Sequence, residues 1–396
     1  MVNITKLYCG EEQPADGLRY GHGHGAPKSA AERRPIVVWN VTRTCNLRCV
    51  HCYSDSHAQK YSGELTHEEA KRVIDDLVTF QVPAVLFSGG EPLVRPDLLE
   101  LMEYAATSGL RVTLSTNGTL IDQPTAQRLH EIGLTYVGIS LDGIGETNDL
   151  FRGKKGAFDD AVRGMRNCRA VSQKVGLRLT LTRRNCMDLH DIFNFIEAEN
   201  IQRACFYHLV YSGRGNAADE LTKAEVRRAM DIILERTRSF HERGLKKEIL
   251  TVDNHADNAY LYLKLGERQS ARAEEVYQWM KWNGGGANSS GIGIANIDTQ
   301  GNVHPDQFWQ SATLGNVKQR RFSEIWSDNS IPLLAGLRNR LPLLKGRCGQ
   351  CRFKEICGGS FRVRAAQVYG DPWASDPACY LTESEIGLAE ANALTM

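Results

Sequence analysis

Residues 36–53 read IVVWNVTRTCNLRCVHCY, and this stretch decides the fold. Its first five residues form a short apolar run, which is typical of a buried strand in a parallel sheet. Cys45, Cys49 and Cys52 follow with the spacing C-x3-C-x2-C. In a cytosolic chain, clustered cysteines indicate metal ligands before disulfides. The stretch therefore predicts a strand followed directly by a metal-binding loop.

The same alternation of apolar run and amphipathic helix continues to about residue 245. Strand alternating with helix is typical of a parallel sheet with right-handed crossovers. Six such units predict an α/β fold with a partial (β/α)6 TIM-like barrel, rather than the eight units of a closed barrel. A capping box at Thr66 and Glu69 marks the start of the first of these helices. The expected strands are 36–40, 84–87, 111–115, 136–141, 176–181 and 204–209.

Four parts are expected along the chain. Residues 1–34 are polar and dotted with Gly and Pro, which indicates an irregular lead-in. The barrel spans 35–245, a linker or bridging region spans 246–285, and a C-terminal domain with further cysteines spans 286–396. Within that domain, 294–303 predicts a hairpin around a Gln-Gly turn.

Composition excludes several function classes. The chain has 396 residues, and 48 Lys and Arg nearly balance 47 Asp and Glu. Such a balance gives no argument for a nucleic-acid or membrane-surface partner. No apolar run approaches the roughly 18 residues of a membrane span, and the N-terminus lacks the apolar core of a secretory signal. We therefore expect a cytoplasmic protein without nucleic-acid or membrane partners.

The cysteines form two groups with different capacities. Three thiolates at Cys45, Cys49 and Cys52 can hold three irons of a four-iron cubane and leave the fourth iron open. Zinc stays an alternative here, because His51 and His57 lie nearby, although a closed zinc site needs four ligands. The second group has four thiols, which fit either zinc or a fully ligated [4Fe–4S] cluster. Its members are Cys348, Cys351, Cys357 and Cys379.

Three further motifs follow the second, third and fourth expected strands. They are GGEP at 89–92, STNG at 115–118 and SLDG at 140–143. Each alone is weak, since Gly-containing turns are common at strand ends. In this order, behind C-x3-C-x2-C in the loop after the first strand, they resemble the radical AdoMet (radical SAM) superfamily. The resemblance covers about residues 35–245.

The resemblance implies a [4Fe–4S] cluster on the first three cysteines, with S-adenosyl-L-methionine (AdoMet) chelating its open iron. In that superfamily an electron from the cluster cleaves AdoMet and releases a 5′-deoxyadenosyl radical. His51 takes the place of the family's usual aromatic residue beside the adenine, and Ser140 is the preferred contact ahead of Asn117. The implied AdoMet contacts are His51, Gly89, Gly90, Glu91, Pro92, Ser115, Asn117, Ser140 and Asp142.

The second cysteine group resembles the C-terminal SPASM extension of these enzymes, which carries auxiliary clusters. Relative to that pattern, one auxiliary cluster has lost its ligands, because Phe361, Asp306 and Ser/Gly residues around 289–291 stand where cysteines are expected. The other keeps all four. The resemblance therefore implies two [4Fe–4S] clusters in total.

Residues outside the shared core carry a narrower resemblance. The segments at 4–10 (ITKLYCG), 37–53 and 250–265 (LTVDNHADNAYLYLKL) look like the enzymes of alternative haem and haem d1 synthesis. The similarity is greatest to didecarboxysiroheme deacetylases of the AhbC type, which implies removal of two acetates to give Fe-coproporphyrin III. Removal of propionates, as in NirJ-type enzymes of haem d1 synthesis, is one alternative. A SPASM-type peptide maturase is the other.

An iron tetrapyrrole such as didecarboxysiroheme carries carboxylates around an apolar macrocycle. Its site therefore needs basic or imidazole groups at the rim and aromatic side chains along the faces. We also expect an electron donor such as a ferredoxin or flavodoxin. The candidate substrate residues are His208, Tyr211, Arg214, His255, Tyr260, Lys281, Trp282, Asn283 and His304.

Overall fold

The computed structural model describes residues 1–12, 16 and 32–388. In this part of the chain, eleven strands form one sheet in the order β1-β8-β7-β6-β5-β4-β3-β2-β9-β10-β11. The strands are β1 (Val2–Asn3), β2 (Ile36–Thr42), β3 (Val85–Gly89), β4 (Val112–Thr116), β5 (Tyr136–Ser140), β6 (Val175–Leu181), β7 (Arg203–His208), β8 (Glu248–Val252), β9 (Ile294–Ile297), β10 (Asn302–His304) and β11 (Gly315–Asn316).

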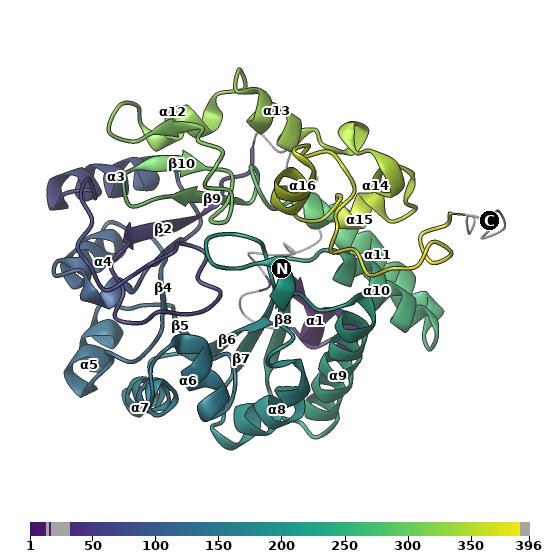
Figure 1. Ribbon diagram of the computed structural model, residues 1–396, viewed down its shortest axis with the longest axis horizontal. Helices are drawn as coiled ribbons and strands as arrows, with labels where there is room; N and C mark the ends of the chain where they lie inside the picture. Colours follow the sequence, from purple (N-terminus) through teal and green to yellow (C-terminus); the bar gives the residue numbers. More distant parts are fainter. Residues whose placement is uncertain (13–15, 17–31, 389–396) are drawn as a thin grey trace.

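Strands β2 to β8 pair in parallel in chain order, so all their carboxyl ends meet at one mouth. The six expected strands are confirmed, and the sheet curves as an open barrel (Figure 1). β9 joins the free edge of β2 in parallel, and β9 and β10 form the expected antiparallel hairpin.

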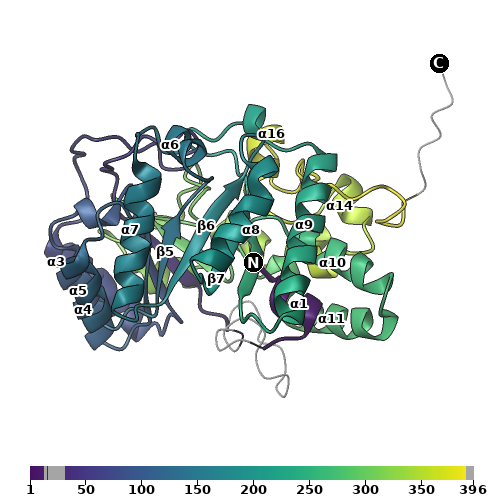
Figure 2. The same cartoon turned by 90° about the horizontal axis from the view of Figure 1, so that it is seen from below.

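The helices cover the outer side of the curved sheet, while the C-terminal elements lie across its open side (Figures 1 and 2). The helices are α1 (Ile4–Cys9), α3 (His67–Thr79), α4 (Leu98–Thr107), α5 (Gln123–Glu131), α6 (Glu146–Arg152), α7 (Ala157–Ala170), α8 (Leu189–Ala198), α9 (Lys223–Glu242), α10 (Ala256–Gly266), α11 (Ser270–Trp282), α12 (Phe322–Ser327), α13 (Pro332–Arg338), α14 (Gly346–Gln350), α15 (Lys354–Cys357) and α16 (Arg362–Tyr369).

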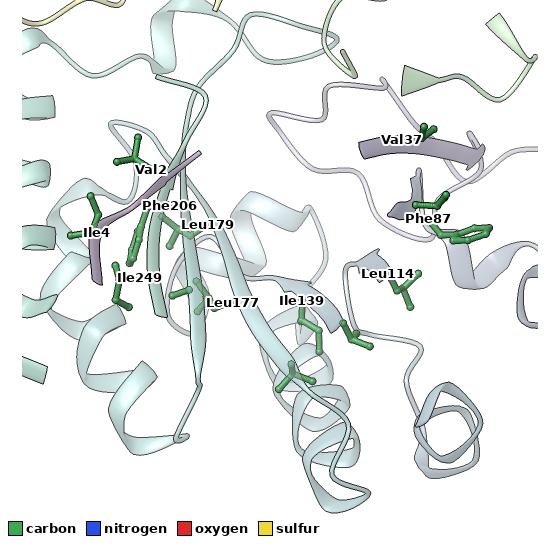
Figure 3. Close-up of a cluster of buried hydrophobic side chains, with 14 of the residues drawn as sticks. Val2, Ile4, Val37, Phe87, Leu114, Ile139, Leu177, Leu179, Phe206 and Ile249 are labelled. Carbon is green, nitrogen blue, oxygen red and sulfur yellow. The ribbon is translucent and has the colours of Figure 1, made fainter. Parts of the chain in front are cut away.

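Alternate side chains of the barrel strands point to the hydrophobic core and to the inside of the barrel. On β6, Leu177 and Leu179 are buried in the core that also holds the helices' apolar residues, and Figure 3 shows them with Ile139 and Phe206 of the neighbouring strands. Because successive side chains point to opposite faces, Arg178 and Thr180 face the inside of the barrel. The predicted capping box is present at the start of α3, where the Thr66 N–H donates to Glu69 Oε2 at 2.8 Å.

The structure differs from the expected part boundaries at two places. Residues 2–9 of the lead-in form β1 and α1, because Val2 and Asn3 pair with β8 and the α1 side chains Ile4 and Leu7 are fully buried. Residues 13–15 and 17–31 of the lead-in lie outside the described part. The expected linker begins with β8, which adds a seventh parallel strand beside β7. The sequence does not predict β8, because three charged residues at 246–248 interrupt the apolar pattern at its start.

Within the described residues, every helix is too short or too polar to span a bilayer.

Candidate active site

A cavity of about 1130 Å³, counted to its open mouth, lies at the carboxyl ends of the parallel strands. Its lining comes from the loop after β2 and from the ends of every strand from β3 to β8. Among the lining residues are Cys45, Cys49, His51, Cys52, Gly89, Gly90, Ser115, Asn117, Ser140, Asp142, Arg152, Arg178, Tyr207, His208, Arg214, Asp253, Gln307 and Phe308.

The cysteine loop after β2 is held by hydrogen bonds to its sulfurs and to its backbone. The Leu47 N–H donates to Cys45 Sγ at 3.4 Å, and the Ser56 N–H donates to Cys52 Sγ at 3.5 Å. The guanidinium of Arg214 donates to the Cys49 carbonyl oxygen at 2.8 Å and thereby ties the loop to the segment after β7. Such donors stabilise thiolates and tune clusters bound to them.

Glycines bring the β3 loop against the cysteine loop. A Cβ on Gly90 would lie 2.3 Å from the Thr44 carbonyl oxygen, and one on Gly89, where φ is +140°, would lie 2.3 Å from that of Thr42. Only glycine permits this approach of two backbones. The fit makes the two loops one continuous cradle.

Glu91 and Pro92 are not among the residues that line the cavity, and their expected contact with AdoMet stays a prediction. The Glu91 carboxylate is fully buried and accepts hydrogen bonds from Thr116 Oγ1 and the Asn117 N–H, both at 2.7 Å. Burial nevertheless raises its pKa above the usual range. Glu91 therefore joins the β3 and β4 loops, and its oxygens are occupied before any ligand arrives.

His51, Asp142 and Arg152 form a charged group beside Cys49. Asp142 Oδ2 pairs with His51 Nε2 at 3.3 Å and with the Arg152 guanidinium. Although burial opposes ionisation, Arg152 and His51 lower the pKa of Asp142 to about 2. Arg152 Nη1 also lies 3.5 Å from Cys49 Sγ. The Nδ1 atom of His51 and the Nε atom of Arg152 are buried without a partner in the described structure.

Arg152 was not singled out from the sequence. It lies ten residues after Asp142, at the end of the short helix α6, and only the fold brings the two together. A signal was present in the sequence, because Arg152 follows Asp142 within the single segment that joins β5 to α7.

Two of the candidate substrate residues, His208 and Arg214, line the cavity. His208 Nε2 pairs with Asp257 Oδ2 at 3.0 Å, which fixes the imidazole. Tyr211 instead lines a neighbouring cavity, and its hydroxyl donates to Glu220.

The remaining candidates lie elsewhere, each for a local reason. Helix α11 packs on α10 and α15 and carries three of the candidates at or just after its end, Lys281, Trp282 and Asn283. Lys281 is exposed there and pairs with Glu355 at 3.0 Å. The His304 Nδ1–H donates to the Ala312 carbonyl oxygen, in the loop between β10 and β11, at 2.9 Å. His255 stacks on Phe361, and the Tyr260 hydroxyl donates to Asp231 at 2.7 Å.

A second, smaller cavity of about 400 Å³ is lined by all four C-terminal cysteines, Cys348, Cys351, Cys357 and Cys379. Two backbone amides donate to their sulfurs: Phe353 N–H to Cys351 at 3.3 Å, and Asp376 N–H to Cys348 at 3.4 Å. No three His, Cys, Asp or Glu side chains in the described part of the chain converge closely enough to hold a single metal ion. The thiols of each group line a shared space instead.

The region expected to have lost its cluster ligands is filled by protein groups. Arg340 is buried there and donates to the Ser290 carbonyl oxygen at 2.7 Å. Asp306 accepts hydrogen bonds from the Phe308 and Trp309 N–H groups, at 2.8 and 3.1 Å. Phe361 is also buried.

A buried ion pair links the two cavities. Arg364 donates to both carboxylate oxygens of Asp376 at 2.8 and 3.0 Å, and both side chains are at most 1% exposed. Arg364 Nη1 also donates to the Asp253 carbonyl oxygen at 2.7 Å. Asp253 lines the large cavity, while the Asp376 N–H donates to Cys348 in the small one.

The chain is similar to known proteins over most of its length. The family model "Radical SAM superfamily" matches residues 39–196. The chain is 53% identical over 401 residues to the Fe-coproporphyrin III synthase of Methanosarcina barkeri, covering 99% of this chain and 100% of that protein. It is 46% identical over 359 residues to the pre-heme d1 synthase of Dinoroseobacter shibae, covering 90% and 88%.

Among solved structures, SuiB of Streptococcus suis bound to its precursor peptide SuiA matches with a TM-score of 0.69. The match covers 89% of this chain and 77% of that one, at 18% identity. At this identity the likeness shows the shared fold alone, a partial barrel with a C-terminal extension.

Proposed function

Because the chain belongs to the radical SAM superfamily, we propose that it uses AdoMet and an iron–sulfur cluster to convert didecarboxysiroheme to Fe-coproporphyrin III by removing two acetate side chains. The observation that carries this proposal is the identity of more than half, along the full length, with an Fe-coproporphyrin III synthase. Superfamily membership establishes AdoMet and one cluster. The residues that hold them, and the second cluster, are part of the proposal.

The three thiols that line the large cavity are suited to a cluster with one open iron. We assign Cys45, Cys49 and Cys52 as its ligands. The cradle formed by Gly89 and Gly90 supports their loop, and the Arg152 guanidinium beside Cys49 stabilises the thiolate form. A cluster held by these three cysteines, together with AdoMet, would supply the radical chemistry that removes a hydrogen atom from the substrate.

The polar groups next to the cysteine loop are suited to bind AdoMet. Asp142 orients His51, whose free Nδ1 and ring face remain for an adenine, and the ring packs edge-on against Phe151 at 5.2 Å. Ser115, Asn117 and Ser140 present hydroxyl and amide groups at the adjacent strand ends.

The part of the cavity formed by the end of β7, the segment after it and Phe308 has the mixed character that an iron tetrapyrrole requires. Phe308, Leu209 and Val210 offer apolar surface, and His208 and Arg214 offer polar groups. An apolar wall also excludes water from reactive intermediates. The substrate carboxylates need cations, which the same cavity contains.

We assign a second, fully ligated [4Fe–4S] cluster to Cys348, Cys351, Cys357 and Cys379, within a SPASM-like C-terminal domain. With no open iron, it would pass electrons rather than bind substrate. We further propose a ferredoxin or flavodoxin as electron donor and a cytoplasmic location, because clustered free thiols require a reducing compartment.

The deciding experiment is an anaerobic assay with reconstituted clusters, AdoMet, a reductant and didecarboxysiroheme, read by mass spectrometry. Fe-coproporphyrin III together with 5′-deoxyadenosine supports the proposal. AdoMet cleavage with an unchanged tetrapyrrole contradicts the haem assignment. Cys186→Ser, which changes a half-buried cysteine in neither group, serves as a matched control with unchanged turnover.

Pre-heme d1 synthase activity is the second candidate, because the similarity to that enzyme also spans most of both chains. The same assay separates the two reactions, since a product that has lost propionates instead of acetates has a different mass.

A further inference from the structure

One end of the large cavity carries polar groups that neither the cluster nor the AdoMet assignment uses. Arg178 comes from β6, Tyr207 from β7, and Asp253 directly follows β8. Gln307 reaches the same cavity from the loop after β10. These residues therefore border the part of the cavity that is left for the substrate.

The position of Arg178 is built into the sheet. In the register of β5 and β6, Gly138 stands beside Gly176, and a Cβ on Gly138 would lie 2.6 Å from Arg178 Cδ. The guanidinium lies over the Tyr207 ring, 4.7 Å from its centre. Among the residues that the structure describes, no carboxylate approaches it within ion-pair distance and no acceptor takes a hydrogen bond from it. A guanidinium held in a cavity in this way is suited to an incoming anion.

Asp253 is held in place through its backbone while its carboxyl group is left without a partner. Its φ is +70°, in the left-handed region that few residues other than glycine adopt, and Arg364 holds its carbonyl oxygen. Asp253 is 2% exposed, and its Oδ2 has no hydrogen-bond partner in the described structure. Gln307 Oε1 likewise has no hydrogen-bond partner there. Burial raises the pKa of Asp253 to about 7.

We propose that Arg178 and Asp253 together bind a carboxylate side chain of the tetrapyrrole substrate; this inference rests on the proposed function. The planar guanidinium of Arg178 takes the carboxylate in a two-pronged contact. Asp253, in its protonated form, donates a hydrogen bond to the same group, since two carboxyl groups in contact share one proton. The carboxylate belongs either to an acetate that is removed or to a propionate that stays.

The test is an anaerobic absorbance titration of the cluster-loaded enzyme with didecarboxysiroheme and, separately, with Fe-coproporphyrin III. Arg178→Gln is expected to weaken binding roughly 30-fold or more, as loss of a buried charged hydrogen-bond partner does, and Arg178→Lys less. Weaker binding of didecarboxysiroheme alone identifies an acetate, and equal weakening for both ligands identifies a propionate. Arg163→Gln, on the exposed face of α7, is the control and should bind like the wild type.

Asp253 is tested by two variants at pH 6. Asp253→Asn keeps a hydrogen-bond donor and should bind within a few-fold of the wild type, whereas Asp253→Leu should lose binding as Arg178→Gln does. Equal loss in both variants overturns the donor role. Iron content and melting temperature verify that each variant is folded.

The outcomes separate this inference from the proposed function. If the wild type binds neither tetrapyrrole, the proposed function fails. If the wild type binds and converts didecarboxysiroheme while folded Arg178→Gln binds it equally well, the proposed function stands and the carboxylate site is wrong.

Discussion

The two cysteine groups present the same kind of side chain in very different surroundings. The first lines a cavity of about 1130 Å³ with charged and polar walls, and the second lines one of about 400 Å³ whose walls are mostly apolar. The first has three thiols and room beside them, whereas the second has four and little free space. The difference teaches that a site for chemistry needs an open coordination position and room for a ligand, while a site for electron transfer needs neither.

The comparison predicts its largest effect at Cys49. We expect Cys49→Ser to lose one cluster, about half of the bound iron, and to form no detectable 5′-deoxyadenosine, because a cubane with two remaining ligands no longer presents a stable open iron. Iron analysis and chromatography of AdoMet products measure both. Full AdoMet cleavage in this variant would remove Cys49 from the ligand set.

At the second group, the same substitution should have a different result. Cys351→Ser should also lose about half of the iron. However, AdoMet cleavage itself should continue, and less tetrapyrrole product should form for each AdoMet cleaved. The reason is that the second cluster is proposed to pass electrons during conversion of the tetrapyrrole. The measurement is the ratio of Fe-coproporphyrin III to 5′-deoxyadenosine. An unchanged ratio and normal turnover would show that the second cluster has no electron role.

The sequence predicts the first group and its neighbours well, because their positions follow from local order. Each strand end carries its polar motif within a few residues, and parallel strands bring those ends together. Asn117 and Asp142, for example, line the cavity as their places after β4 and β5 indicate.

Residues whose surroundings are set by tertiary packing could not be predicted from the local sequence. The exposure of Lys281 depends on how α11 packs, and the direction of Arg178 depends on a glycine in the adjacent strand. Arg364 and Asp376 are twelve residues apart and meet only because the last loop folds back over α16. No local pattern announces these contacts, so the sequence alone did not single out Arg178, Asp253 or Arg364.

The ion pair of Arg364 with Asp376 joins the two regions, and its removal should destabilise both. Arg364→Met leaves a buried carboxylate unpaired, so we expect the free energy of unfolding to fall by about 3–5 kcal/mol. Urea denaturation followed by circular dichroism measures it. The exposed pair of Arg163 with Asp160 provides the control, since Arg163→Met should cost about 1 kcal/mol or less. A loss no larger than the control would mean that the pair does not hold the regions together.

The smallest expected effect is a pH dependence of the free energy of unfolding that arises from Asp253. This residue lines the large cavity, and its carbonyl oxygen accepts a hydrogen bond from Arg364. Burial raises the pKa of Asp253 to about 7 even though the N-terminal amino group, Arg364 and Arg178 favour its ionised form, and Asp306 adds to the rise. A raised pKa in the folded state means that the unfolded chain releases this proton first as pH increases. The contribution to stability is therefore complete below about pH 4 and is lost as pH rises to about 7, at up to about 1.4 kcal/mol per pH unit.

Asp253→Asn carries no such proton, so its free energy of unfolding should not show this loss. The difference in free energy of unfolding between variant and wild type should therefore shift in favour of the variant from pH 5 to pH 7 and stay constant above pH 7. Denaturation curves of the two proteins at pH 5, 6, 7 and 8 measure the difference. If the difference does not change with pH, Asp253 is ionised throughout this range, and it then repels a substrate carboxylate instead of donating a hydrogen bond to it. In that case Arg178 alone would have to bind the substrate carboxylate. Asp253, which Arg364 connects to the second cysteine group, would then be a charged residue and not a proton donor.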